Sequence, residues 1–368
     1  MNEKMTYAGV GVNYEEMDPF KRLAQLAGRE TAKNISRLGF SEVEMSRGES
    51  AYLMDAGDHY VAHVEEGLGT KDLVADAMYR LTGKSYYDHI AQCTMAMIVN
   101  DMITLGALPL SVAMHLAVGV SSWFSDEYRC QDLIAGWKRA CDLARCTWGG
   151  GETPTLKDIV YPDAVVLSGS AVGVVKPKSR LIDAAKIQHG DAIVIIGSSG
   201  IHANGLTLAR EIASKLPKGY LSRLSDGRPY GEALLDPTTI YVPLVEDCFD
   251  QGVDIHYAVN ITGHGWRKLM RATESLAYVI DRIPVPHPVF SFIQEHGPVD
   301  DQEAYANLNM GAGFALYVGD RDVERVLTVA HALGMFALRA GVVESSKMKR
   351  VIIRPVGLEY LGSTLGVR

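Results

Sequence analysis

Hydrophobic and polar residues follow two different periods along this chain. Apolar residues recur at helical spacing in long segments with few breakers, whereas shorter segments alternate or are continuously apolar, as strands do. The spacing predicts helices over 20–38, 87–105, 127–146, 206–216 and 238–251, and strands over 60–64, 110–120, 164–175, 192–196 and 314–318, with a further apolar segment at 255–261. Strands separated by helices predict α/β or α+β domains, although neither half has the regular βαβ cadence of a dinucleotide-binding fold.

The segment Lys176-Pro177-Lys178 interrupts this pattern near the middle of the chain. Proline stops the preceding strand, and the flanking charges keep the segment in solvent. Because single hydrophobic cores stop growing at about 250–300 residues, a chain of 368 residues is expected to form two domains. We therefore predict domains at 1–175 and 176–368.

Composition excludes several classes of protein. Hydrophobic residues at 47% and charged residues at 22% are ordinary for a globular protein, which excludes disorder, collagen and coiled coils. A net charge of −8 without a run of Lys or Arg argues against a nucleic-acid surface. The five cysteines include no Cys-x-x-Cys pair, so reduced thiols are expected. Residues 1–14 lack an apolar signal core, and no run of about 18 apolar residues occurs, so we predict a cytoplasmic protein with no membrane contact.

Two glycine-rich segments are candidates for binding phosphate. The segment 197–205 follows a predicted strand and precedes a predicted helix, which makes an anion site of backbone N–H groups, with His202 as a donor or acid/base. The segment 67–71 ends in Thr70-Lys71 and has the chemistry of a phosphate loop without the Walker spacing. The alternatives are a capped tight turn for the first segment and a solvated surface lysine for the second.

Three carboxylates lie beside these segments and suit magnesium, which takes hard oxygen ligands and keeps several waters. Glu66 precedes the segment 67–71, Asp101 follows an apolar helical run, and Glu152 follows three glycines. A buried carboxylate such as Asp101 is costly unless it has a cation or hydrogen bonds. The alternatives are a helix-capping role for Asp101 and an ordinary turn for Glu152.

Histidines give a weaker signal. His256 and His264 flank the turn Thr262-Gly263 and are the better placed, whereas the others, among them His115, show no metal-ligand spacing. A Gly-x-Ser-x-Gly motif is absent from the sequence, so a serine nucleophile is not expected.

Together the loops form an ordered set of motifs that spans nearly the whole chain. The set is Tyr7-Ala8-Gly9-Val10, Gly67-Leu68-Gly69-Thr70-Lys71, Val99-Asn100-Asp101, Gly106-Ala107-Leu108-Pro109-Leu110, Gly150-Gly151-Glu152-Thr153, the loop 197–205, Pro237-Thr238-Thr239-Ile240-Tyr241-Val242, Ile261-Thr262-Gly263 and Asn309-Met310-Gly311-Ala312-Gly313. This set resembles the aminoimidazole ribonucleotide synthetase family of purine biosynthesis, also called phosphoribosylformylglycinamidine cyclo-ligase. The resemblance implies a two-domain α/β (α+β) fold with mixed sheets flanked by helices, and a homodimer formed through the amino-terminal domains.

The resemblance also implies an activity. ATP with Mg²⁺ would phosphorylate an amide oxygen of formylglycinamidine ribonucleotide, an internal nitrogen would attack, and phosphate would leave as the imidazole ring closes. Such chemistry needs positioning and charge neutralisation more than a protein nucleophile. Carried over position by position, the implied roles are metal binding for Glu66, Asp101 and Glu152; ATP binding for Gly67, Gly69, Thr70, Lys71, Asn100, Gly150 and Gly151; substrate binding for Ser198, Ser199, Gly200, His202, Asn204, Thr262, Gly263 and His264; and catalysis for Lys71, His202 and His256.

Five positions depart from the family pattern. Glu66 stands in place of Asp, Cys93 in place of a common acidic residue, Thr239 in place of an arginine, and Asn260 and His264 in place of a histidine and a glycine. Most of these changes touch the substrate side. Three hypotheses follow: the cyclo-ligase itself, a paralogue that phosphorylates a different amide, carboxylate or phosphate, and a non-catalytic nucleotide-binding subunit.

Overall fold

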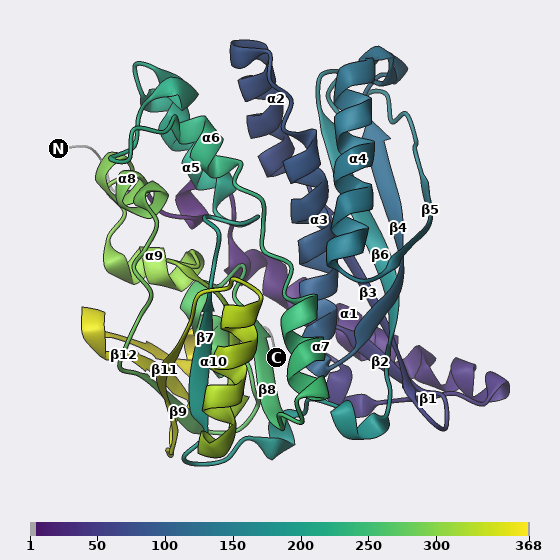
Figure 1. The fold of residues 1–368 in the computed structure, drawn as a ribbon. Coiled ribbons are helices and arrows are strands. Elements are labelled where there is room, and N and C mark those ends of the chain that lie inside the picture. The colour runs from purple at the N-terminus through teal and green to yellow at the C-terminus, as the bar shows by residue number, and fades with distance from the viewer. Residues whose placement is uncertain (1–4, 367–368) are drawn as a thin grey trace.

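The structure, a computed structural model, describes residues 5–366 and contains two mixed β-sheets with helices between and around them (Figure 1). The first sheet has six strands in the order β1-β2-β3-β6-β4-β5, of which only β4 and β5 are parallel neighbours. Its strands are β1 (Ser41–Glu42), β2 (Tyr52–Asp55), β3 (Tyr60–Leu68), β4 (Leu108–Val118), β5 (Thr147–Glu152) and β6 (Val165–Val175).

Helices cover one face of this sheet and leave the other open (Figure 1). Along β6, buried residues alternate with exposed or half-buried ones, as expected of a strand with one covered face. The helices of this half are α1 (Tyr14–Thr31), α2 (Thr70–Thr82), α3 (Tyr87–Met102) and α4 (Glu127–Leu143). Helix α3 packs on β3 and β6 and also contacts β8 of the second sheet, so it lies between the two sheets.

The second sheet has seven strands in the order β13-β12-β9-β11-β7-β10-β8. Its strands are β7 (Ala192–Gly197), β8 (Ile255–Asn260), β9 (Leu276–Ile280), β10 (Ala312–Val318), β11 (Ala337–Ser345), β12 (Arg350–Ile353) and β13 (Leu358–Leu361). Strands β8 and β10 are buried at every residue, so side chains on both of their faces are covered. The helices of this half are α5 (Leu206–Lys215), α6 (Tyr230–Leu234), α7 (Val242–Asp250), α8 (Pro288–His296), α9 (Asp301–Asn307) and α10 (Val323–Ala332).

The predicted fold class is confirmed, while several element boundaries were wrong. The segment 67–71 is not a loop, because β3 runs to Leu68 and α2 begins at Thr70. The glycine-rich segment before Thr153 is strand β5, and the helix predicted from residue 238 begins only at Val242. All strands of the first sheet precede residue 176, but the domain boundary itself stays a prediction. Among the helices within residues 5–366, none is long and apolar enough to cross a membrane, and all five cysteines are free thiols.

Candidate active site

Two carboxylates of the first domain meet the second domain. Glu66 lies near the end of β3, and Asp101 lies in the last turn of α3. Asp101 does not cap the helix: its Oδ1 accepts a hydrogen bond of 2.7 Å from Nδ2 of Asn260, at the end of β8. Burial and the charge of Asp101 raise the pKa of Glu66 to about 7. The two side chains therefore form a close acidic pair in a poorly solvated position.

Cations of the second domain face this carboxylate pair. Lys268, in the short 3₁₀ helix Gly265–Met270, is buried and donates a hydrogen bond to Oγ1 of Thr262. Burial lowers the pKa of Lys268 to about 8, against the opposing effect of Asp101. Arg271 donates to Ser50 Oγ and to the Gly48 carbonyl oxygen, at 2.9 and 2.8 Å. Lys268 and Arg271 were missed from the sequence, where they stand in the basic segment Arg267–Arg271 without a motif that marks them.

The raised pKa of Glu66 gives a prediction for stability. In the folded chain the Glu66 carboxyl is protonated below about pH 7. In the unfolded chain it is protonated only below about pH 4.5. Between these values the folded state binds more protons, so the free energy of unfolding falls as pH rises. Glu66→Gln should flatten this fall and raise the melting temperature of the metal-free protein at pH 8, with little effect at pH 4.5. Thermal unfolding across pH 4.5–8 checks this; an unchanged slope in the variant would contradict it.

The acidic pair suits a hard cation, but the third predicted ligand lies elsewhere. Glu152 is exposed on β5, in register with His115 of β4, whose Nδ1 lies 3.1 Å from Oγ of Ser168. Within residues 5–366 no group of three or more His, Cys, Asp or Glu side chains is arranged to hold a metal ion. Glu66 and Asp101 can supply two carboxylate ligands, which is enough for Mg²⁺ when phosphate oxygens and waters complete its coordination.

Lys71 occupies a different environment from the one expected of a phosphate-binding lysine. Its side chain is 0% exposed, and Nζ donates hydrogen bonds of 2.8 Å to the carbonyl oxygens of His202 and Asp236. Both carbonyls belong to the second domain. Lys71 therefore joins the domains in this structure, because α2 begins at Thr70 and directs the lysine inward.

The glycine-rich loop 197–205 connects β7 to α5, as the sequence predicted, and its polar groups bind one another and their neighbours. Ser198 Oγ donates to Asn309 Oδ1 at 3.0 Å, and Ser199 Oγ donates to the Pro237 carbonyl at 2.6 Å. The Ser199 backbone N–H donates to Nε2 of His202 at 3.1 Å. Burial, with a smaller contribution from Lys71, lowers the pKa of His202 to about 3, so this imidazole is neutral and accepts a hydrogen bond.

A groove of about 600 Å³ lies beside this loop and between the domains. Ser198 and Ser199 line it together with Gln92 of α3 and with Thr239, the position at which the resemblance led us to expect an arginine. None of its lining side chains is charged. Thr239 therefore adds no charge to this groove.

The segment 235–241, which forms one wall of the groove, is held through its backbone by side chains of the first domain. Asn100 uses both polar atoms, donating to the Thr239 carbonyl at 2.8 Å and accepting from the Tyr241 N–H at 2.9 Å. Cys93 Sγ accepts from the Thr238 N–H at 3.3 Å. At Cys93, where the resemblance led us to expect an acidic residue, the thiol therefore accepts a hydrogen bond from one wall of the groove.

The other predicted site residues are spread over three places. His256 bonds Asp191 at 2.8 Å near the start of β8, about 13 Å along the strand from Asn260, so the geometry does not favour catalysis by His256. His264 is buried with φ 69°, and burial lowers its pKa to about 3. Gly150 and Gly151 lie on β5, where a Cβ at Gly151 would meet the Met114 carbonyl oxygen at 2.1 Å, so close strand pairing explains that glycine. Gly200 and Asn204 lie in the loop 197–205, and Gly263 lies in the turn that follows β8.

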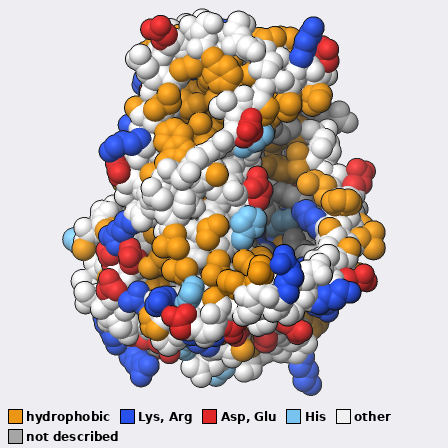
Figure 2. Space-filling model, turned by 90° about the vertical axis from the view of Figure 1, so that its right-hand side faces the viewer, with side chains coloured by type: hydrophobic (Ala, Val, Ile, Leu, Met, Phe, Trp, Pro, Cys, Tyr) orange, Lys and Arg blue, Asp and Glu red, His pale blue; other side chains and the backbone are white. Residues whose placement is uncertain are grey.

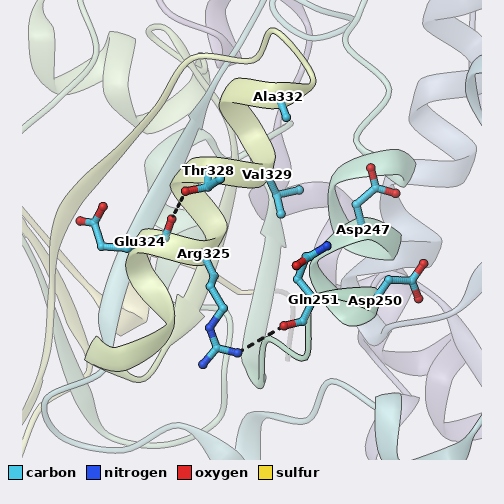
Figure 3. Close-up of a pocket in the computed structure, with 8 residues that line it drawn as sticks. All are labelled: Asp247, Asp250, Gln251, Glu324, Arg325, Thr328, Val329 and Ala332. Atoms are coloured by element: carbon cyan, nitrogen blue, oxygen red, sulfur yellow. Dashed lines mark hydrogen bonds between the residues drawn. The ribbon is translucent and has the colours of Figure 1, made fainter.

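A second groove, of about 530 Å³, lies between α7 and α10 (Figure 3). None of the predicted site residues lines it. Its acidic side chains Asp247 and Asp250 pair with Arg145 and Arg180, and Arg325 donates to the Gln251 carbonyl at 3.3 Å. This groove is separate from the candidate site.

Comparison with protein families covers most of the chain. Residues 48–175 match the family described as AIR synthase related protein, N-terminal domain, and residues 188–354 match the C-terminal domain of the same description. Two curated relatives are named phosphoribosylformylglycinamidine cyclo-ligase. The one from Methanocaldococcus jannaschii is 32% identical over 92% of this chain and 91% of its own. The one from Pyrococcus furiosus is 34% identical over 92% and 97%.

Solved structures share the fold at low identity. Phosphoribosylformylglycinamidine synthase II from Thermotoga maritima superposes with a TM-score of 0.57 at 17% identity, over 87% of this chain and 46% of that one. The hydrogenase maturation protein HypE of E. coli superposes with a TM-score of 0.58 at 16% identity, over 82% and 84%. These two matches show a common architecture and no more. With both family models and the curated relatives in agreement, the chain belongs to the AIR synthase (phosphoribosylformylglycinamidine cyclo-ligase) family.

Proposed function

We propose that the chain is a cytoplasmic, ATP-dependent cyclo-ligase that converts formylglycinamidine ribonucleotide to aminoimidazole ribonucleotide and releases ADP and phosphate. The relatives that carry this activity in their name align over nearly the whole chain. The single structural observation that carries the proposal is the acidic pair Glu66–Asp101, which faces Asn260 and Lys268 across the domain junction. This pair supplies two carboxylates that can bind a metal ion at the domain junction.

Glu66 and Asp101 would hold Mg²⁺, which when bound would neutralise phosphate charge and polarise the transferred phosphoryl group. Phosphate binding by the backbone at Gly67, Gly69 and Thr70 is supported by the start of α2, where no side chain caps the helix. Asn260 orients the Asp101 carboxylate. Lys71 binds the backbone of the His202 and Asp236 loops and so stabilises the segments that line the groove.

The test of this proposal is a complete turnover measurement. Purified protein is mixed with ATP, Mg²⁺ and formylglycinamidine ribonucleotide, and ADP, phosphate and aminoimidazole ribonucleotide are quantified. We expect the three products in equal amounts. ADP formed only with a different amide, carboxylate or phosphate substrate would instead favour a paralogue with another substrate. The uncharged Thr239 is the reason to consider that alternative. ATP binding without turnover on any substrate would favour a non-catalytic subunit.

We also propose a homodimer formed through the open face of the first sheet. Hydrophobic side chains gather on this side of the molecule around histidine and acidic groups (Figure 2). Leu110 of β4 and Val172 of β6 are 52% and 44% exposed there, and apolar clusters of this kind mark interaction surfaces. A second copy would cover this face and the edge of β5, and would bring the groups around Glu152 next to another chain.

Val172→Glu should break this dimer, because it places a charge in an apolar interface. Sedimentation velocity should give a species of twice the chain mass of 40.1 kDa for the parent protein and of one chain mass for the variant. Val285→Glu is the matched control, since Val285 is 89% exposed and far along the chain from this sheet. A parent protein that sediments as a monomer, or a variant that still dimerises, would contradict the proposed interface.

A further inference from the structure

Lys268 carries a buried charge that has no carboxylate in direct contact. The residue is 8% exposed, and within residues 5–366 the one hydrogen bond of its ammonium goes to the hydroxyl of Thr262, a neutral group. Burying an ammonium is costly unless negative charge nearby offsets the lost hydration. The acidic groups that act on Lys268 are Asp101 and, more weakly, Glu66.

The neighbouring Arg271 is not the main cation that offsets the charge of Glu66 and Asp101. Arg271 has its own carboxylate, Glu49, with Nε 3.4 Å from Oε2, and its other nitrogens bind the backbone and hydroxyl of the segment 48–50. Its charge is therefore largely matched within that contact. Arg271 still acts on Glu66, but more weakly than Lys268 does, so Lys268 is the main cation that balances the acidic pair.

We propose that Lys268 acts as a built-in counter-cation for the Glu66–Asp101 pair, so that the free enzyme binds a divalent cation there weakly and binds it well only together with ATP. The inference rests on the metal role of this pair in the proposed function. The second domain would thereby control which form of the metal ion binds. The fixed positive charge of Lys268 repels a metal ion that is not bound to nucleotide. The triphosphate brings negative charge to the same place and removes that opposition.

The geometry explains why this lysine stays in position. Its backbone carbonyl accepts a hydrogen bond of 2.9 Å from the Arg271 N–H, and Arg271 is tied to the segment 48–50 of the first domain. Thr262, which receives the ammonium, lies in the turn that follows β8, two residues after Asn260. The charge is thus held by the same domain junction that orients Asp101.

The experiment measures Mn²⁺ binding to the full-length, metal-free protein without nucleotide, by electron paramagnetic resonance of the unbound ion. Lys268→Met should bind Mn²⁺ about tenfold more tightly or better, because one positive charge near the ion is removed. Lys268→Arg keeps the charge and should match the parent. Lys347→Met removes the same charge from an exposed position of the same domain and should also match the parent. Adding Glu66→Gln to Lys268→Met should abolish the gain, which locates the effect at the pair.

Mn²⁺ affinity in Lys268→Met that is equal to or below that of the parent would overturn the inference. If Lys268→Met does not fold, as judged by thermal unfolding, Lys268→Gln keeps a hydrogen-bond donor for Thr262 and gives the same prediction. Because no substrate is turned over, a failed cyclo-ligase assay leaves this result interpretable. Tighter Mn²⁺ binding without cyclo-ligase activity would support the counter-cation and reject the proposed reaction.

Discussion

Asp101→Asn should reduce ATP-dependent turnover by about 10³-fold or more while leaving the fold intact, because it removes a metal-binding charge where phosphate charge must be neutralised. The amide oxygen of the new side chain can still accept the hydrogen bond from Asn260, so the domain junction is retained. Steady-state kinetics with ATP and formylglycinamidine ribonucleotide, together with thermal unfolding, check both parts.

Asp247→Asn is the matched control, because it makes the same chemical change in the separate groove between α7 and α10, where Asp247 pairs with Arg145 (Figure 3). Its turnover should equal that of the parent protein. Full activity in Asp101→Asn would exclude this carboxylate from metal binding, and the proposed active site would lose its main support.

Lys71→Met should lower the free energy of unfolding by about 3–5 kcal/mol, because the carbonyls of His202 and Asp236 lose their buried donor. Activity should fall with it, since both loops lie beside the uncharged groove. Chemical denaturation gives the stability, and the exposed Lys84→Met is the control, expected to stay within about 0.5 kcal/mol of the parent.

The outcome separates two interpretations of Lys71. The sequence indicated a lysine that binds ATP phosphates, whereas the structure shows one that joins the domains. Unchanged stability with a large increase in KM for ATP would favour the phosphate role and reject the structural one.

The parts of the fold that the sequence predicts well are those with a strong local pattern. The apolar run of β7, the glycine-rich loop and the amphipathic helix α5 follow one another as expected, because each depends on neighbouring residues alone. Strand β5 was missed since its glycines carry no side-chain pattern; they serve close pairing with β4 instead. Helix α2 was missed because glycine and lysine at its start have the composition of a phosphate loop.

The candidate site was predicted only in part, because its geometry depends on distant contacts. Glu66 and Asp101 were identified as two of three candidate metal ligands, yet the hydrogen bond that orients Asp101 joins residues 159 positions apart. No local signal connects them. The same holds for Lys268, which the fold, and not its neighbours in sequence, brings to the acidic pair. Glu152 was grouped with these two carboxylates because it follows three glycines, and β5 carries it to the open face instead.

The central claim is that this chain activates an amide oxygen by phosphorylation and then closes a ring. The most direct measurement uses formylglycinamidine ribonucleotide labelled with ¹⁸O in the amide oxygen, and mass spectrometry of the phosphate released. We expect the label in inorganic phosphate, in step with aminoimidazole ribonucleotide and ADP. Release of unlabelled phosphate without consumption of the labelled substrate would contradict the account. Formation of aminoimidazole ribonucleotide with the label recovered in water would also contradict it.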